Sequence, residues 1–293
     1  MKVTGFTFIR NAVLLDYPIL EAIRSILPLC DEIVVAVGKS EDETLQLIQS
    51  LDDPRIRILH TEWDDSLRQG GRVLAIETDK ALAAVSPDAD WAVYIQGDEV
   101  LHEDGLPALR QAMQEALHRP EIEGLLLPYR HFYASYDYVG TDSRWYPLEV
   151  RVVRPHRGIY SWGDAQGFRI QPQRKLRVLQ TTAWMHHYGW VREPAAMQRK
   201  QEKFHRLWHD DAWMKQNIPV AEAFDYQLRP SSLARYQGTH PAVMTERIAR
   251  INWSFNADPS YHRLTLKDRF KQFALRYLGW DLNHRNFRRI RSY

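Results

Sequence analysis

Two acidic residues stand directly after an apolar run in the first third of the chain. The run 91–95 is followed at once by Gln96-Gly97-Asp98-Glu99. In an open parallel sheet, ligands bind beyond the carboxyl ends of the strands. A carboxylate at such a position is well placed to hold Mg²⁺ or Mn²⁺, hard cations that prefer oxygen ligands. The alternative is an acidic loop that caps the next helix.

A second group of candidate ligands ends a β-like region. The segment 185–189 reads Met-His-His-Tyr-Gly. Neighbouring side chains on a strand point to opposite faces, so only one of His186 and His187 can face a ligand site. An imidazole beside a carboxylate adds a nitrogen ligand and favours Mn²⁺ over Mg²⁺. A histidine that is buried for structural reasons is the alternative.

The first hundred residues alternate β-like runs with segments of helical periodicity. Runs 33–37 and 91–95 are continuous and apolar, as in parallel strands that are buried on both faces. Further strands are predicted over 3–9 and 56–59, and helices over 18–27, 44–51, 74–85 and 106–117. Strands that alternate with such helices indicate βαβ units and an α/β fold with a mostly parallel sheet.

The pattern changes in the second half of the chain. Residues 124–190 are β-like and rich in aromatic side chains, and from Pro194 onward helical patterns dominate. No low-complexity linker separates these parts. We therefore expect one main domain over 1–193 and a C-terminal helical extension over 194–293 that packs on it.

Composition excludes some classes of partner. The 293 residues carry a formal net charge of +2, too near balance for a chain that binds nucleic acid across its surface. No window approaches the ~20 apolar residues that a membrane-spanning helix requires. A single cysteine, Cys30, fits a reducing compartment, and we expect a cytoplasmic protein.

The C-terminal end differs from the rest in charge. Residues 264–293 contain eight Lys or Arg against two Asp, interleaved with aromatic residues. A basic amphipathic helix of this kind can lie on an anionic membrane, which predicts a peripheral contact at the inner membrane face. A solvated helix or a dimer contact is the alternative, and the oligomeric state stays open.

Several motifs taken together resemble the family-2 glycosyltransferases of bacterial cell-surface polysaccharide or lipopolysaccharide synthesis. These motifs are FIRN, EIVVAVGKSEDET, DWAVYIQGDEV and HHYG. The resemblance implies the GT-A fold, a Rossmann-like fold for nucleotide-diphospho-sugar transfer, with the catalytic domain over 1–193. Asp98 matches the last Asp of the family's D-x-D metal motif, and His187 matches a His that completes the metal shell. A divalent cofactor, Mn²⁺ or Mg²⁺, is implied at these two residues.

The same resemblance assigns residues to the nucleotide-sugar donor. Ser40, Asp42 and Thr44 match the tail of the family's D-D-G-S-x-D-x-T motif, and Gln96 replaces the first Asp of the metal motif. Val37 and Gly38 stand where relatives carry acids that contact the nucleobase, so a uridine diphosphate donor does not follow. The expected donor-binding residues are Arg10, Asn11, Asp42, Arg72 and Gln96.

The acceptor side needs a base that takes a proton from the attacking hydroxyl. The segment SWGDAQGFR, over 161–169, lies where relatives place acceptor-side residues. Asp164 is the candidate base and Glu149 its rival, with ion pairing to Arg151 or Arg154 as the alternative role of either.

The predicted function is metal-assisted transfer of a sugar from a nucleoside-diphosphate sugar to a glycan or glycolipid hydroxyl, with inversion implied by the resemblance alone. One alternative is a non-catalytic relative that binds nucleotide-sugars or carbohydrate. The other is a nucleotidyltransferase, which would need a Gly-rich basic loop after the first strand, and the segment FIRNAVLLD has none.

Overall fold

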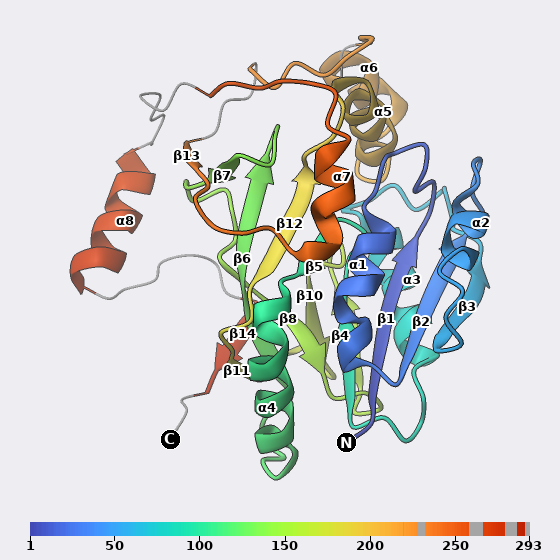
Figure 1. The fold of residues 1–293 in the computed structure, drawn as a ribbon, viewed down its shortest axis with the longest axis vertical. Coiled ribbons are helices and arrows are strands. Elements are labelled where there is room, and N and C mark those ends of the chain that lie inside the picture. Colours follow the sequence, from blue (N-terminus) through green and yellow to red (C-terminus); the bar gives the residue numbers. More distant parts are fainter. Residues whose placement is uncertain (219, 228–231, 258–265, 279–285, 291–293) are drawn as a thin grey trace.

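The computed structural model describes all residues except 219, 228–231, 258–265, 279–285 and 291–293 (Figure 1). Its strands are β1 (Val3–Ile9), β2 (Glu32–Gly38), β3 (Ile56–Thr61), β4 (Trp91–Tyr94), β5 (Glu99–Leu101), β6 (Gly124–Tyr133), β7 (Tyr138–Gly140), β8 (Leu148–Val153), β9 (Ile159–Trp162), β10 (Gly167–Ile170), β11 (Arg174–Gln180), β12 (Met185–Trp190), β13 (Leu233–Arg235) and β14 (Phe287–Arg289). Its helices are α1 (Ile19–Ile26), α2 (Thr44–Gln49), α3 (Arg72–Ala83), α4 (Leu106–Leu117), α5 (Pro194–His205), α6 (Asp211–Asn217), α7 (Thr245–Ala249) and α8 (Leu266–Leu278), with short 3-10 helices at Leu27–Leu29, Glu103–Gly105 and Ala242–Met244.

The main sheet has a parallel core. Its strand order is β3-β2-β1-β4-β8-β6-β11-β10-β9. The first four strands are mutually parallel, β8 is antiparallel to both of its neighbours, and β6 and β11 are parallel again. The predicted α/β fold class is confirmed.

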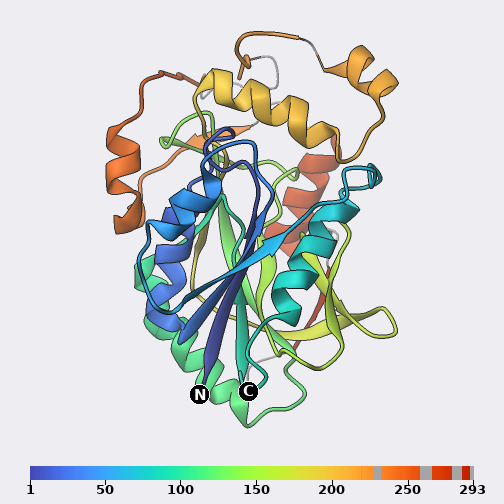
Figure 2. The same ribbon diagram turned by 90° about the vertical axis from the view of Figure 1, so that its right-hand side faces the viewer.

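Helices cover both faces of this core, which explains why residues 33–37 of β2 are all apolar. Ile33, Val35 and Val37 pack in the cluster that contains α1 and α4. Val34 and Ala36 pack on the opposite face, in the cluster that contains α3. Figure 2 shows α1 and α4 on one side of the sheet and α3 on the other. A strand between two helical layers has no polar face, as the sequence pattern predicted.

The carboxyl ends of β1 and β4 lie at the same edge of the sheet because these strands are parallel neighbours. Helix α5 lies across this edge in Figure 2. β12 runs antiparallel to β5, with His187 opposite Glu99 in the register. The loop that carries Asp98 and the strand that carries His187 are thereby brought side by side.

The part of the chain after Pro194 contributes strands as well as helices. β13 pairs with β7, and β14 runs parallel to β11. Helix α8 lies to one side of the sheet in Figure 1. Among the described helices, none combines the length and the hydropathy needed to span a bilayer.

Candidate active site

A cavity of about 770 Å³ opens at the carboxyl ends of β1 and β4. Six of the nine predicted site residues line it, and they come from four separate segments of the chain: Arg10, Asn11, Gln96, Asp98, Asp164 and His187. The other three, which do not line it, are Asp42, Arg72 and Glu149. Residues far apart in sequence, from the β1 end to β12, therefore share one site.

Asp98 lies buried in the floor of this cavity among positive charges. Its Oδ2 accepts a hydrogen bond from Lys200 Nζ at 3.1 Å, and Arg192 Nη2 is 3.6 Å from the same oxygen. Burial by itself raises the pKa of the Asp98 carboxyl. The charges of Lys200, His187 and Arg192 outweigh that effect and hold the pKa well below its ordinary value. Asp98 is thus a carboxylate at neutral pH.

The hydrogen bonds of His131 determine which nitrogen of His187 carries its proton. His131 Nε2 is 2.7 Å from the carbonyl oxygen of Tyr146, which can only accept, so Nε2 donates. Burial lowers the pKa of His131 to about 3 and of His187 to about 4, so both rings are neutral, with one N–H each. His131 Nδ1 therefore accepts from His187 Nδ1, at 3.0 Å. The Nε2 of His187 keeps its lone pair.

That lone pair faces Asp98. His187 Nε2 is 3.7 Å from Asp98 Oδ1, so two acceptors stand opposite each other. Gly189 lies beside them, and a Cβ at this position would be 2.6 Å from His187 Nε2 and 3.0 Å from Asp98 Oδ2. Only glycine leaves this space open.

These groups fit the divalent metal that the resemblance implies. One carboxylate oxygen and one imidazole nitrogen with a free lone pair form a donor set suited to Mn²⁺. The described residues contain no group of three or more His, Cys, Asp or Glu that could hold a metal ion. An ion at Asp98 and His187 would therefore take further ligands from a bound diphosphate or from water.

Glu99, the neighbour of Asp98, points away from the cavity. Its carboxylate accepts two hydrogen bonds from Arg151, at 2.8 and 2.9 Å, and one from Tyr129 at 2.8 Å. Glu99 and Arg151 are both fully buried. Of the two adjacent acidic residues, Asp98 therefore has its carboxylate in the site and Glu99 has its carboxylate in the protein core.

Gln96 connects the end of β4 to the loop that carries Asp164. Its Nε2 donates to the carbonyl oxygen of Ala165 at 3.1 Å and to the Tyr94 hydroxyl at 3.3 Å. Asp164 is half-buried and lines the cavity. Gly71 adjoins it from the start of α3, so the position of the Asp164 loop depends on two other segments.

The loop after β1 is held by several polar contacts. Arg10 pairs with Asp65 at 2.5 Å, and its guanidinium lies 5.5 Å from the ring centre of Trp63. Asn11 Oδ1 accepts from the backbone N–H of Glu41 at 2.8 Å. Asp42 Oδ2 accepts from the backbone N–H of Leu14 at 2.7 Å, which ties this loop to the start of α2.

Arg72 and Glu149 lie outside the main cavity. Arg72 lines a second, smaller cavity of about 580 Å³ with Trp208 and Trp213. Glu149 does not line the main cavity, whereas Gln166 does, and Gln166 Nε2 donates to Glu149 Oε1 at 2.9 Å. Burial raises the pKa of Glu149 to about 7, although Arg151 opposes the shift. Neither arginine considered as an alternative partner of Glu149 pairs with it, because Arg151 bonds to Glu99 and Arg154 Nε donates to the Ile122 carbonyl oxygen.

Sequence analysis missed three residues of the site, namely His131, Arg192 and Lys200. His131 lies in β6, in register with His187 of β12. Lys200 follows the buried Met197 by three residues on α5, so it belongs to the apolar face of that helix. A lysine at such a position is the signal that could have identified it.

No protein-family model and no curated protein matches this chain. S. aureus TarS is similar in structure, with a TM-score of 0.40 and 15% identity over 76% of this chain and 41% of TarS. The 1–349 form of TarS in complex with UDP has a TM-score of 0.41 and 13% identity. That match covers 76% of this chain and 68% of the 1–349 form.

A third similar structure is glucosyl-3-phosphoglycerate synthase from Mycobacterium tuberculosis, in complex with Mn²⁺, UDP and glucosyl-3-phosphoglycerate. Its TM-score is 0.29, with 23% identity over 45% of this chain and 44% of that one. This chain therefore spans less than half the length of TarS and of the synthase. The α/β fold follows from the chain's own strand order.

Proposed function

We propose that this chain is a glycosyltransferase similar to those of family 2, which moves a sugar from a nucleoside-diphosphate sugar to an acceptor hydroxyl. One observation carries the proposal: a single cavity joins the donor-side residues predicted from the sequence, at Arg10, Asn11 and Gln96, to Asp98, His187 and Asp164. Its volume of about 770 Å³ is within the range of small-molecule sites.

The donor diphosphate would lie beside Asp98 and His187. A divalent metal held by these residues would supply positive charge to the departing diphosphate. Arg10, Asn11 and Gln96 line the same cavity and would orient the nucleotide. The tautomer of His187, fixed by His131 and the Tyr146 carbonyl, keeps a lone pair toward this position.

Asp164 is the proposed base. Its carboxylate would take the proton of the acceptor hydroxyl while the oxygen forms a bond to the anomeric carbon, and the bond from that carbon to the phosphate oxygen breaks. A single displacement of this kind inverts the anomeric centre. Asp164 lines the cavity, whereas its rival Glu149 is behind Gln166, and this difference favours Asp164.

A glycan or glycolipid acceptor is proposed together with a peripheral membrane contact. Helix α8 exposes a large apolar side chain at each of four positions spaced by three or four residues, namely Leu266, Phe270, Phe273 and Tyr277. In a basic segment, this stripe is suited to an anionic lipid surface.

Co-sedimentation with vesicles of anionic and of neutral lipid tests the contact. Phe270→Ser with Phe273→Ser should reduce binding to the anionic vesicles, and unchanged binding would exclude α8.

The proposed function is tested by thermal shift with UDP, GDP, ADP and dTDP, each with and without Mn²⁺. A nucleotide that binds only the native state raises its melting temperature. Slow hydrolysis of the corresponding nucleotide-sugar then identifies an enzyme. Binding without hydrolysis or transfer would favour the non-catalytic relative, and no stabilisation by any of the four nucleotides would contradict the proposal.

A further inference from the structure

Lys200 brings a positive charge from α5 into the cavity. Its side chain is 10% exposed, and the residue lines the cavity wall. Its Nζ donates to Asp98 Oδ2 at 3.1 Å and to the Gly189 carbonyl oxygen at 2.9 Å. An ammonium has three N–H groups, and the hydrogen bonds of the described residues use two of them. The third is available to a ligand.

The charges around Asp98 do not balance. Lys200 and Arg192 both lie within 3.6 Å of its carboxylate, so two cations face one anion. Glu99, the neighbouring carboxylate, is occupied by Arg151 in the core. Within the described part of the chain, this leaves one positive charge in excess at a buried site. Such an excess is costly unless an anion completes the site.

Arg192 is the second cation near Asp98 Oδ2, and it lies deeper in the protein than Lys200. It is fully buried, and its Nε donates to the Leu15 carbonyl oxygen at 2.8 Å. Its Nη2 has no hydrogen-bond partner among the described residues, although it lies 3.6 Å from Asp98 Oδ2. The two positive charges near Asp98 Oδ2 therefore exceed the single negative charge of the carboxylate. The other oxygen, Oδ1, faces His187.

We propose that Lys200 binds the donor's diphosphate directly and that, with Arg192, it allows nucleoside diphosphates to bind without a divalent metal. This inference rests on the proposed function and adds a residue to it. When the bond from the anomeric carbon to phosphate breaks, the leaving diphosphate gains one negative charge. Lys200 keeps its proton and stabilises that charge through the remaining N–H. A metal at Oδ1 and His187 would add to this charge and not replace it.

A purely structural role for Lys200, as a link between Asp98 and Gly189, makes a different prediction. In that case Lys200 contributes to stability but not to nucleotide affinity in the absence of metal. The two roles are separated by titration calorimetry of the full chain in EDTA and in Mn²⁺, with the nucleotide that stabilises it most among UDP, GDP, ADP and dTDP.

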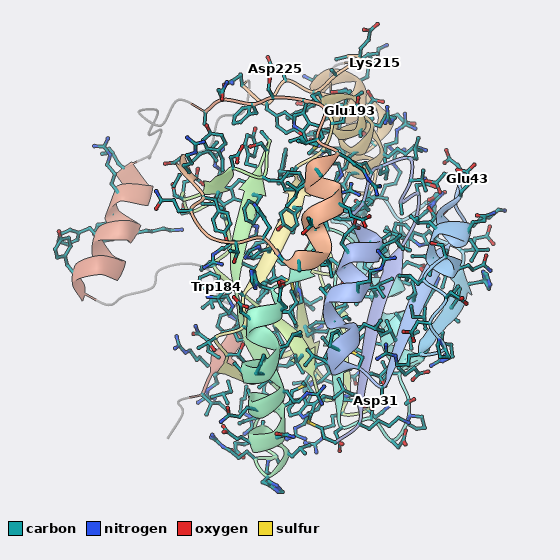
Figure 3. All side chains as sticks on the ribbon, in the orientation of Figure 1. Asp31, Glu43, Trp184, Glu193, Lys215 and Asp225 are labelled. Carbon is teal, nitrogen blue, oxygen red and sulfur yellow. The ribbon has the colours of Figure 1, made fainter. Side chains whose placement is uncertain are left out.

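The variants are Lys200→Met, Lys200→Gln and Lys215→Met. Glutamine can still donate to Asp98 and Gly189 but has no charge. Lys215 is exposed on α6, outside both cavities, and extends from the surface in Figure 3, so it is the matched control. We expect the wild-type chain and Lys215→Met to bind the nucleotide in EDTA. Both Lys200 variants should bind it roughly 10- to 100-fold more weakly, the loss of a charged hydrogen bond, and Mn²⁺ should restore part of the affinity.

Each other outcome overturns a specific claim. If the wild-type chain binds only in Mn²⁺, Lys200 does not replace the metal, while the glycosyltransferase proposal stands. Equal affinities of Lys200→Gln and Lys215→Met in EDTA would assign Lys200 a structural role. If no nucleotide binds in either condition, the proposed function itself fails. The wild-type measurement in EDTA decides the first point even if a Lys200 variant does not fold.

Discussion

His187 Nε2 and Asp98 Oδ1 face each other 3.7 Å apart, and neither has a hydrogen to offer the other. The proton of His187 is on Nδ1, directed at His131. The carboxylate is already bonded on its other oxygen by Lys200. Two acceptors held in this way are ready for a cation or for a donor group of a ligand, and this relationship leads to the first prediction.

Replacement of His187 should weaken Mn²⁺ binding in the presence of a nucleoside diphosphate. His187→Ala removes the nitrogen lone pair, so the Mn²⁺ concentration at half-saturation, followed by EPR, should rise at least tenfold, the range seen when metal-site partners are removed. His186→Ala is the comparison. That residue is fully buried on the opposite face of β12, beside Arg130 and Tyr188, so its loss should lower stability and leave Mn²⁺ affinity near normal. A larger loss of Mn²⁺ affinity in His186→Ala would show that the wrong histidine was assigned.

Substitution of Gly71 should disturb the Asp164 loop. Gly71 has a φ of +66°, and a Cβ there would lie 2.7 Å from Asp164 Cβ and 2.5 Å from the Trp208 ring. Gly70 is a matched control, because its φ is +58° and no atom lies within 4 Å of an added Cβ. In both alanine variants the left-handed backbone conformation lowers stability by about 1–2 kcal/mol. Only Gly71→Ala should lower stability further and reduce transfer. Equal melting temperatures and turnover for the two variants would contradict this contact.

Glu149 should make stability depend on pH. Burial raises its pKa from 4.5 to about 7 in the folded chain. Between these values the unfolded chain releases a proton that the folded chain retains, so the contribution of Glu149 to stability is fully present below pH 4.5 and is lost as pH rises through 7. The shift corresponds to about 3 kcal/mol.

Urea unfolding at pH 4.5 and pH 8 measures this effect. The free energy of unfolding of the wild-type chain should fall relative to that of Glu149→Gln between the two pH values. Asp79, whose pKa burial raises to about 6, should contribute in the same direction, so Asp79→Asn is compared separately. A constant difference between wild type and Glu149→Gln across this range would show that Glu149 has an ordinary pKa.

Local sequence patterns predicted the fold better than the site. The apolar run at 33–37 indicated a strand buried on both faces, because every residue of this run packs against one of two helical layers. Asp98 was identified since a strand end determines where its carboxylate lies. Lys200 and His131 were missed because their roles depend on contacts across 102 and 56 residues of chain, which no local pattern encodes.

The proposed role of Asp164 as the base leads to the last prediction. If its carboxylate takes the acceptor proton, Asp164→Asn should lose the contribution of general base catalysis, about 10²–10⁴-fold in the rate of transfer. Nucleotide affinity should stay near normal, because the proposed diphosphate site consists of Asp98, His187 and Lys200 and does not include Asp164. Slow hydrolysis of the donor should also persist, since water needs less exact placement than a sugar hydroxyl. Transfer rate, donor hydrolysis and calorimetric affinity are measured on the same preparation. Near-normal transfer would exclude Asp164 and direct attention to Glu149, whereas loss of nucleotide affinity together with transfer would place Asp164 on the donor side.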